Sequence, residues 1–275
     1  TVVDSRTVWR LLLEPHPRPG ALNMAIDEAI LRAVAAGQSP PTLRLYGWSP
    51  PTLTLGRGQP SADADVAVLA KAGVDLVRRM TGGTAVLNRD ELTYTVAVAE
   101  NDSHLAGTIV ESYRAVGAAL VSALASLGLT TAEAKEHERG VGPPSSRDRA
   151  PVCFEIPSDY EVTVGGRKLI GSAQMRVRGG ILQHGSLPLK GDIGAISAYL
   201  TQRPDPVRIR SLAITLQEAL GRFAPWAEAA GALIAAFRET LDLSLVESSL
   251  SRDERAQAEA LLTAKYGNPS WTGRL

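Results

Sequence analysis

The sequence predicts an α+β domain that ends in a helical segment, and three observations support this class. Stretches with apolar residues at helical spacing alternate with shorter runs rich in β-branched residues. Glycine pairs at residues 165–166 and 179–180 join alternating runs, as in an antiparallel meander. From residue 192 onward, alanine- and leucine-rich stretches dominate, and these residues favour helices.

The composition is that of an ordinary globular protein. The chain has 275 residues, of which 44% are hydrophobic, so it can bury a sizeable core. Its 29 basic residues balance 29 acidic residues, which gives no argument for binding nucleic acid or an anionic membrane. No run of about eighteen apolar residues occurs, so we expect no transmembrane helix. Cys153 is the single cysteine, which excludes an internal disulfide and fits a reducing cytoplasm.

The first half of the chain mixes helices and strands. Residues 20–37 form the first predicted helix, because an apolar residue recurs every four positions and glycines flank both ends. Proline pairs and β-branched residues then favour short strands around one short helix. The predicted strands are residues 42–48, 52–59, 74–80, 84–87 and 92–98, and the short helix covers residues 61–73.

A long helix and a polar loop occupy the middle of the chain. Residues 107–129 carry an apolar face at helical spacing. Residues 130–152 are polar and contain two prolines, which predicts a loop that leads directly to Cys153; long loops in compact domains are often functional. Three strands and four helices follow, at residues 160–164, 168–177, 181–189, 192–200, 209–221, 226–241 and 251–267. We therefore divide the chain into a catalytic domain, residues 1–205, and a C-terminal helical extension, residues 206–275, packed on the same domain.

One candidate ligand site lies in the stretch RRMTGG. Arg78 and Arg79 end a predicted strand, and Gly82 and Gly83 follow in a turn. Arginine binds carboxylate or phosphate with forked donors, and glycine lets backbone amides approach a ligand closely. The spacing matches neither a P-loop nor a dinucleotide-binding fingerprint. A tight turn with two solvated arginines explains the same residues.

Lys168 and Cys153 form a second candidate pair, fifteen residues apart (168 − 153). An ammonium near a thiol favours the thiolate, and the two groups can exchange protons during acyl transfer. By spacing alone, an exposed strand lysine and an unrelated buried thiol fit the residues better than a catalytic pair. His184 on the next strand is either a substrate or proton-transfer group or a structural histidine. The sequence shows no His/Cys cluster that would indicate a structural zinc site.

Five ordered motifs between residues 23 and 189 carry a family resemblance: NMAIDE, PTLTLGRGQ, RRMTGGTAVLNRDELTYTV, GRKLIGSAQMR and ILQHGSLPL. Together they resemble the lipoate-protein ligase and octanoyltransferase superfamily. The resemblance implies the biotin/lipoate protein ligase fold, with a mixed, largely antiparallel sheet and flanking helices.

The stretch CFEIPSDYEVTVGGRKLIGSAQ is similar to the cysteine-dependent octanoyltransferase branch. That resemblance implies transfer of an octanoyl group, in protein lipoylation, from acyl carrier protein to a lysine of a lipoyl domain such as the glycine cleavage H protein. It also implies Cys153 as the acyl-enzyme residue and Lys168 as its partner, without cofactor or metal. The residues expected to bind substrate are Arg78, Arg79, Gly82, Gly83, Gly171, Ser172, Gln174 and His184.

Two other functions stay open. One is an ATP-dependent lipoate-protein ligase, and the other is a non-catalytic protein that binds acyl groups or lipoyl domains. The transferase is favoured because only about seventy helical residues, 206–275, form the C-terminal extension, where many ligases carry a further domain. The chain has Asn88 where many relatives have histidine, so we expect no proton transfer by residue 88.

Overall fold

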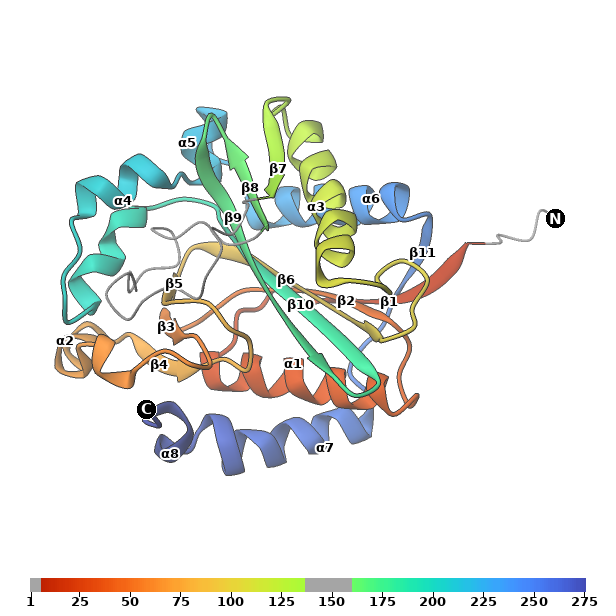
Figure 1. Ribbon diagram of the computed structural model, residues 1–275, viewed down its shortest axis with the longest axis horizontal. Coiled ribbons are helices and arrows are strands. Elements are labelled where there is room, and N and C mark those ends of the chain that lie inside the picture. The colour runs from red at the N-terminus through yellow and green to blue at the C-terminus, as the bar shows by residue number, and fades with distance from the viewer. Residues whose placement is uncertain (1–5, 137–159) are drawn as a thin grey trace.

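The protein is built around one eight-stranded mixed sheet, seen in a computed structural model that describes residues 6–136 and 160–275 (Figure 1). The strand order is β11–β1–β2–β6–β10–β9–β8–β7. The pairs β11–β1 and β1–β2 are parallel and the other five are antiparallel, which confirms the predicted class. The bounds are β1 Thr7–Leu13, β2 Thr42–Tyr46, β6 Glu91–Ala99, β7 Ala132–Glu136, β8 Tyr160–Val164, β9 Arg167–Val177, β10 Gly180–Pro188 and β11 Leu243–Glu247.

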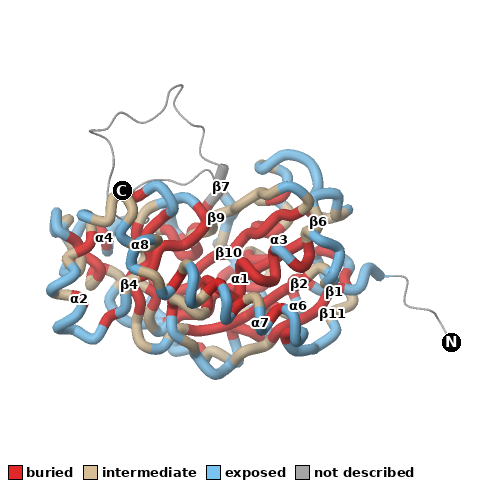
Figure 2. Tube along the Cα trace, turned by 90° about the horizontal axis from the view of Figure 1, so that it is seen from below, coloured by how far each residue is buried: buried red, intermediate tan, exposed pale blue. Residues whose placement is uncertain are grey.

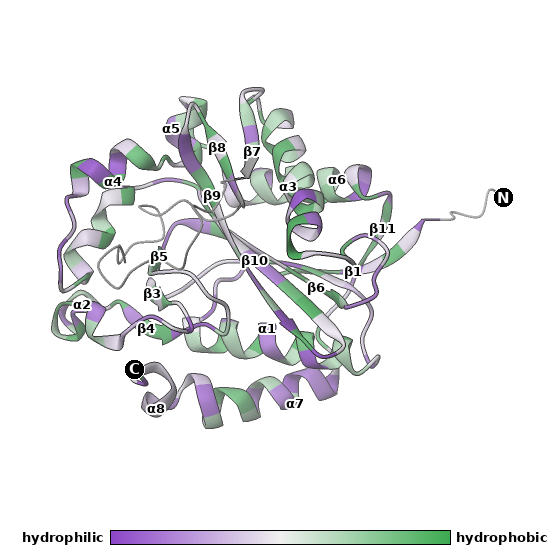
Figure 3. Cartoon of the chain, viewed as in Figure 1, coloured by the Kyte–Doolittle hydropathy of each residue, from purple (hydrophilic) through white to green (hydrophobic). Residues whose placement is uncertain are grey.

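Helices cover both faces of this sheet. Helix α1 (Gly20–Ala35) lies against β6 and β10, and α7 (Arg252–Leu261) covers the outer side of α1 (Figure 1). Helices α3 (Ile109–Ser126) and α6 (Trp226–Thr240) pack on the opposite face. Figure 3 shows hydrophobic and hydrophilic residues alternating along these helices, and Figure 2 shows that buried backbone runs through the sheet. Helix α3 is long and apolar enough to cross a membrane, but it packs against α6, β7 and β8 as a core helix does.

A second, three-stranded sheet lies beside the end of α1, with the order β4–β3–β5. Its hydrophobic core is shared with the helical turns around it. This sheet holds the loop that contains residues 79–85 and directs it toward β10. The elements of this region are β3 (Thr52–Leu55), α2 (Val66–Ala72), β4 (Asp75–Arg78), β5 (Val86–Asn88), a 3₁₀ helix (Ile193–Tyr199), α4 (Pro206–Leu212) and α5 (Leu216–Leu220).

The predicted meander is present as β8, β9 and β10, and its register sorts side chains onto two faces. Because successive strand residues point to opposite faces, His184 and Ser186 share the α1 face with their partners Ala173 and Gly171. Ser172 and Gln174 therefore point to the other face, toward α3. This alternation decides on which face of the large sheet each residue of the candidate site lies.

Strands β1, β7 and β11 were not predicted. Strand β11 pairs with β1 at the edge of the large sheet, although residues from 192 onward were expected to be helical. Strand β7 takes residues 132–136 from the expected 130–152 loop and pairs with β8. In β7 the residues alternate between alanine and charged side chains, and alanine is too small to give a strong strand signal. The remainder of that loop lies outside the described residues.

Candidate active site

Lys168 lies inside the protein near the start of β9. Only 3% of its surface is exposed, and its Nζ donates a hydrogen bond to Oε1 of Glu161 at 2.5 Å. Glu161 stands opposite Gly171 in the β8–β9 pairing, so the ion pair lies on the sheet face that also carries Ser186 and His184. A β-bulge between β8 and β9 separates this pairing from the one that holds Lys168 itself. The lysine thus faces inward, as the family resemblance implied.

Glu161 is a partner of Lys168 that the sequence did not reveal. Its strand, YEVTV, alternates in the way of a half-exposed strand, in which a carboxylate is usually solvated. In the structure only 6% of Glu161 is exposed. Glu161 also lines a cavity of about 130 Å³ between α3 and strands β8 to β10. The other lining residues are Tyr113, Arg114, Gly117, Leu120, Ala134, Val162, Ser172 and Gln183.

The Thr81–Gly82–Gly83 turn presents backbone amides. The carbonyl of Thr81 accepts from the Arg57 amide at 2.8 Å, and that of Gly82 accepts from Arg79 Nη2 at 2.9 Å. Within the described part of the chain, the amides of Gly82 and Gly83 have no hydrogen-bond acceptor, and both glycines are exposed. Gly83 has a φ of +89°, which glycine adopts without strain. The turn therefore offers two amide donors to a ligand oxygen.

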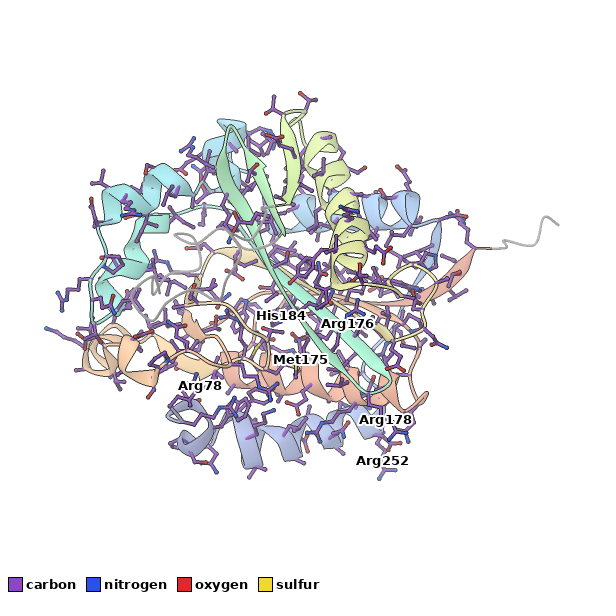
Figure 4. The ribbon with its side chains drawn as sticks, in the orientation of Figure 1. Arg78, Met175, Arg176, Arg178, His184 and Arg252 are labelled. Atoms are coloured by element: carbon purple, nitrogen blue, oxygen red, sulfur yellow. The ribbon has the colours of Figure 1, made fainter. Side chains whose placement is uncertain are left out.

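His184 lies in the centre of β10 (Figure 4), and both of its ring nitrogens have partners. Its Nε2 lies 2.7 Å from the Thr81 hydroxyl, and its Nδ1 lies 3.4 Å from Oδ2 of Asp27 on α1. The histidine is only 7% exposed. It joins α1, the large sheet and the Thr81–Gly83 turn. A direct contact between His184 and substrate stays a prediction.

Two of the other predicted substrate residues lie on the opposite face. The Ser172 hydroxyl is 2.7 Å from the Tyr94 hydroxyl, and Gln174 Nε2 donates to Gln183 Oε1 at 3.1 Å. Burial raises the pKa of Tyr94 to about 12, so this phenol stays neutral. Ser172 borders the cavity beside α3. Strand alternation thus places Ser172 and Gln174 on the α3 face, where Ser172 borders the same cavity as Glu161, and Gly171 lies opposite Glu161.

The two predicted arginines differ in their contacts. Arg78 is fully buried and donates to backbone carbonyls of the 56–59 loop and of the C-terminal residues 271–274. It lies away from His184 in the view of Figure 4. Arg79 donates to the carbonyls of Thr54, Gly82 and Thr84. Both guanidinium groups therefore shape the loops around the site. Their binding to substrate stays a prediction.

Comparison with known proteins places this fold and site in one family. The family described as the lipoyl protein ligase A/B catalytic domain matches residues 19–238. The chain belongs to this family. The matched range includes Lys168, the Thr81–Gly83 turn and His184, so all of them lie within the family's catalytic domain.

Two octanoyltransferases are similar to the chain over almost their full length. The octanoyltransferase LipM of Symbiobacterium thermophilum is 40% identical and covers 98% of this chain and 99% of its own length. LipM of Kyrpidia tusciae is 42% identical, with 97% of this chain and 98% of that protein covered.

Solved structures of lipoate ligases share the fold. A putative lipoate protein ligase from Thermoplasma acidophilum with bound lipoic acid has a TM-score of 0.77 at 26% identity, covering 97% of this chain and 100% of that one. A lipoate-protein ligase A bound with ATP has a TM-score of 0.78 at 27% identity, covering 98% and 100%.

Asn88 departs from the histidine that the family resemblance suggests at this position. Its Nδ2 donates to Oε1 of Glu91 at 3.0 Å, and its buried Oδ1 has no hydrogen-bond partner among the described residues. Glu91 also accepts from Ser186 at 2.6 Å and from Thr93. Burial raises the pKa of Glu91 above its usual range, although these hydrogen bonds lower it. Asn88 is therefore a hydrogen-bond donor to the Glu91 carboxyl group.

Cys153 lies outside the described residues, so its distance from Lys168 stays a prediction. Among residues 6–136 and 160–275, no group of three or more His, Cys, Asp or Glu side chains forms a candidate metal site. The chemistry that the structure brings together is a buried ammonium–carboxylate pair and an amide-lined turn on one face of the sheet.

Proposed function

We propose that the chain is an octanoyltransferase of protein lipoylation that works through a thioester on Cys153. In this proposal octanoyl–acyl carrier protein is the donor, and a lysine of a lipoyl domain, such as that of the glycine cleavage H protein, is the acceptor. The nearly full-length similarity to octanoyltransferases supports the reaction. The observation that carries the mechanism is the buried Lys168 ammonium on the same sheet face as the Thr81–Gly83 turn. The reaction takes place in the cytoplasm.

The first step acylates the enzyme. The Cys153 thiolate attacks the thioester carbonyl of the donor, and the bond between that carbonyl and the phosphopantetheine sulfur breaks. The adjacent Glu161 carboxylate favours the charged form of Lys168, whose positive charge in turn favours the thiolate. Lys168 then gives a proton to the departing phosphopantetheine thiolate and becomes neutral. The amides of Gly82 and Gly83 donate to the carbonyl oxygen as negative charge develops on it.

The second step transfers the acyl group to the acceptor. The acceptor amine attacks the Cys153 thioester, and neutral Lys168 takes the proton that the new amide loses. The Cys153 thiolate leaves, so the thiolate and ammonium of the resting enzyme are restored. Conversion of a thioester to an amide is downhill, and the scheme therefore uses no ATP and no metal.

The octanoyl chain needs an apolar channel, since each buried methylene contributes about 0.8 kcal/mol. Gly171 is proposed to border this channel, because it lies opposite Glu161 and leaves space beside the ammonium. Arg78, Arg79, Ser172, Gln174 and His184 complete the proposed substrate-binding set.

Mass spectrometry of the intact protein tests the proposal. Wild-type enzyme mixed with octanoyl–acyl carrier protein should gain one octanoyl group, and Cys153→Ala should gain none. A lipoyl-domain protein added afterwards should remove the group from the enzyme and gain it as an amide. If wild type takes no octanoyl group but forms a lipoyl adenylate from ATP and lipoate, it is a ligase instead. Binding of either donor without turnover would indicate a non-catalytic protein.

A further inference from the structure

We infer that Asp27 and His184 position the Thr81 hydroxyl, and thereby hold the Gly82 and Gly83 amides where the oxyanion forms. This role rests on the proposed function. Asp27, His184 and Thr81 come from three distant parts of the sequence, on α1, on β10 and after β4. Their side chains nevertheless form one continuous chain of contacts.

Asp27 is the fixed, ionised end of this chain. It is 1% exposed, and its Oδ1 accepts from Arg44 Nη1 at 2.7 Å. Its Oδ2 accepts from the hydroxyls of Tyr46 at 3.0 Å and Thr95 at 2.9 Å. Burial alone would raise the pKa of Asp27, but the Arg44 charge and the His184 contact outweigh it, so the pKa lies below its usual value. Asp27 is thus a carboxylate that only accepts hydrogen bonds.

The carboxylate determines which nitrogen of His184 carries the proton. Because Oδ2 of Asp27 only accepts, the facing Nδ1 of His184 must be protonated. In the neutral ring Nε2 is then an acceptor, and the Thr81 hydroxyl donates to it at 2.7 Å. Thr81 is fully buried, and a buried hydroxyl that loses its only partner is costly. His184 therefore fixes the side-chain rotamer of Thr81.

The fixed threonine begins a segment, residues 81–84, in which three of the four carbonyls accept from other donors. The Thr81 carbonyl accepts from the Arg57 amide, and those of Gly82 and Thr84 accept from Arg79. With the carbonyls held, the Gly82 and Gly83 amides are left for a ligand. The hydrogen bond between the Thr81 hydroxyl and His184 connects this turn to the large sheet.

The turn is anchored on the same sheet face as the Lys168 ammonium. Lys168 Nζ binds Glu161, which stands opposite Gly171, and Gly171 pairs with Ser186. His184, which contacts Thr81, is two residues from Ser186, roughly 7 Å along the strand. We place the thioester carbonyl on this shared face, between the ammonium and the turn. A loss of the Thr81 anchor would move the amides relative to this carbonyl, and misplacement of about 1 Å costs roughly a hundredfold in rate.

The test compares Thr81→Val with Thr81→Ser. Valine keeps the branched shape but removes the hydroxyl, and serine keeps the hydroxyl. Thr52→Val is the matched control, because Thr52 is also fully buried but donates to the Pro50 carbonyl. The readout is the rate of Cys153 octanoylation in a single turnover, followed by intact mass. We expect Thr81→Val to be slowed roughly ten- to hundredfold, while Thr81→Ser and Thr52→Val stay within about threefold of wild type.

Nitrogen NMR of the imidazole provides a readout that does not depend on activity. Wild-type His184 should show a protonated Nδ1 and an unprotonated Nε2 near neutral pH, and Asp27→Asn should lose this preference. A protonated Nε2 in the neutral ring, or undiminished octanoylation in Thr81→Val, would overturn the positioning role alone. If Thr81→Val does not fold, slow octanoylation in Thr81→Ser also counts against it. No adduct on wild-type enzyme would overturn the proposed function itself.

Discussion

Replacing Lys168 with methionine separates its chemical role from its structural one. Methionine has a similar length and no charge, so the change removes the cation that balances Glu161. At the observed 2.5 Å, the pair attraction is roughly 7 kcal/mol at an effective dielectric constant of 20. Desolvation of both charges offsets much of this, and removing one member of a buried pair typically costs about 3–5 kcal/mol. We expect a loss of that size in urea unfolding.

The double variant Lys168→Met/Glu161→Gln should recover most of this stability, because it leaves no unbalanced charge in the site. Octanoyl transfer should not recover, since the proton carrier is still missing. Both variants should transfer at least roughly a hundredfold more slowly than wild type. Arg10→Met is the matched control, because Arg10 forms a second buried ion pair, with Glu254 at 2.6 Å. It should destabilise the protein to a similar extent and still transfer octanoyl.

Two results would refute this reasoning. Transfer by folded Lys168→Met at more than about one-tenth of the wild-type rate would remove Lys168 as the proton carrier. Recovery of transfer in the double variant would show that the single variant fails through misfolding alone. The assay is octanoyl transfer from acyl carrier protein to a lipoyl domain, measured on variants whose folded fraction is known from the unfolding curves.

Other parts of the molecule give three more predictions. Arg44→Met should lower the free energy of unfolding by about 3–5 kcal/mol in urea, because the guanidinium balances two carboxylates in the interior; a loss below about 1 kcal/mol would contradict this. Gly56→Ala places a methyl 1.8 Å from the Gly83 carbonyl oxygen and should slow octanoylation at least roughly tenfold. Gly58→Ala meets no atom within 4 Å and should match wild type. Glu91→Gln should gain stability relative to wild type as pH rises from about 4 to 7. The pKa of Glu91 is raised in the folded protein, so its carboxyl group ionises first in the unfolded chain, near 4.3, and this lowers the stability of the wild type. An equal difference in stability at both pH values would argue against a buried neutral carboxyl.

Periodic and glycine-marked parts of the fold could be predicted from the sequence. Helices α1 and α3 follow from apolar spacing, and the β9–β10 hairpin follows from its glycine turn. Strands β1 and β11 were not predicted, and their parallel pairing joins residues more than two hundred positions apart. Such a pairing depends on the tertiary structure and has no local signal.

Some residues of the candidate site could likewise be predicted from the sequence, and others could not. Lys168 and the Thr81–Gly83 turn carry motifs that the sequence reveals, whereas Glu161 and Asp27 look like ordinary surface carboxylates in their own segments. Glu161 is buried through the bulged β8–β9 register. Asp27 is buried because it faces the large sheet, where its partners are Arg44, Tyr46, Thr95 and His184. A charged residue on the covered face of a helix breaks the apolar pattern, so helical spacing does not reveal it.

Four of the five motifs that carry the family resemblance contribute to one set of contacts around the turn. An amide pair can stabilise an oxyanion only if its turn is held rigidly, and these four motifs hold it. Replacing one motif would release the turn even if the ion pair stayed intact. The contributions are Asp27 from NMAIDE, Gly56 and Arg57 from PTLTLGRGQ, Arg79 and Thr81 from RRMTGG, and His184 from ILQHGSLPL. The fifth motif, GRKLIGSAQMR, contains Lys168 and Gly171. In the proposed mechanism Lys168 carries the proton in both steps, and the other residues hold the turn whose amides face the oxyanion.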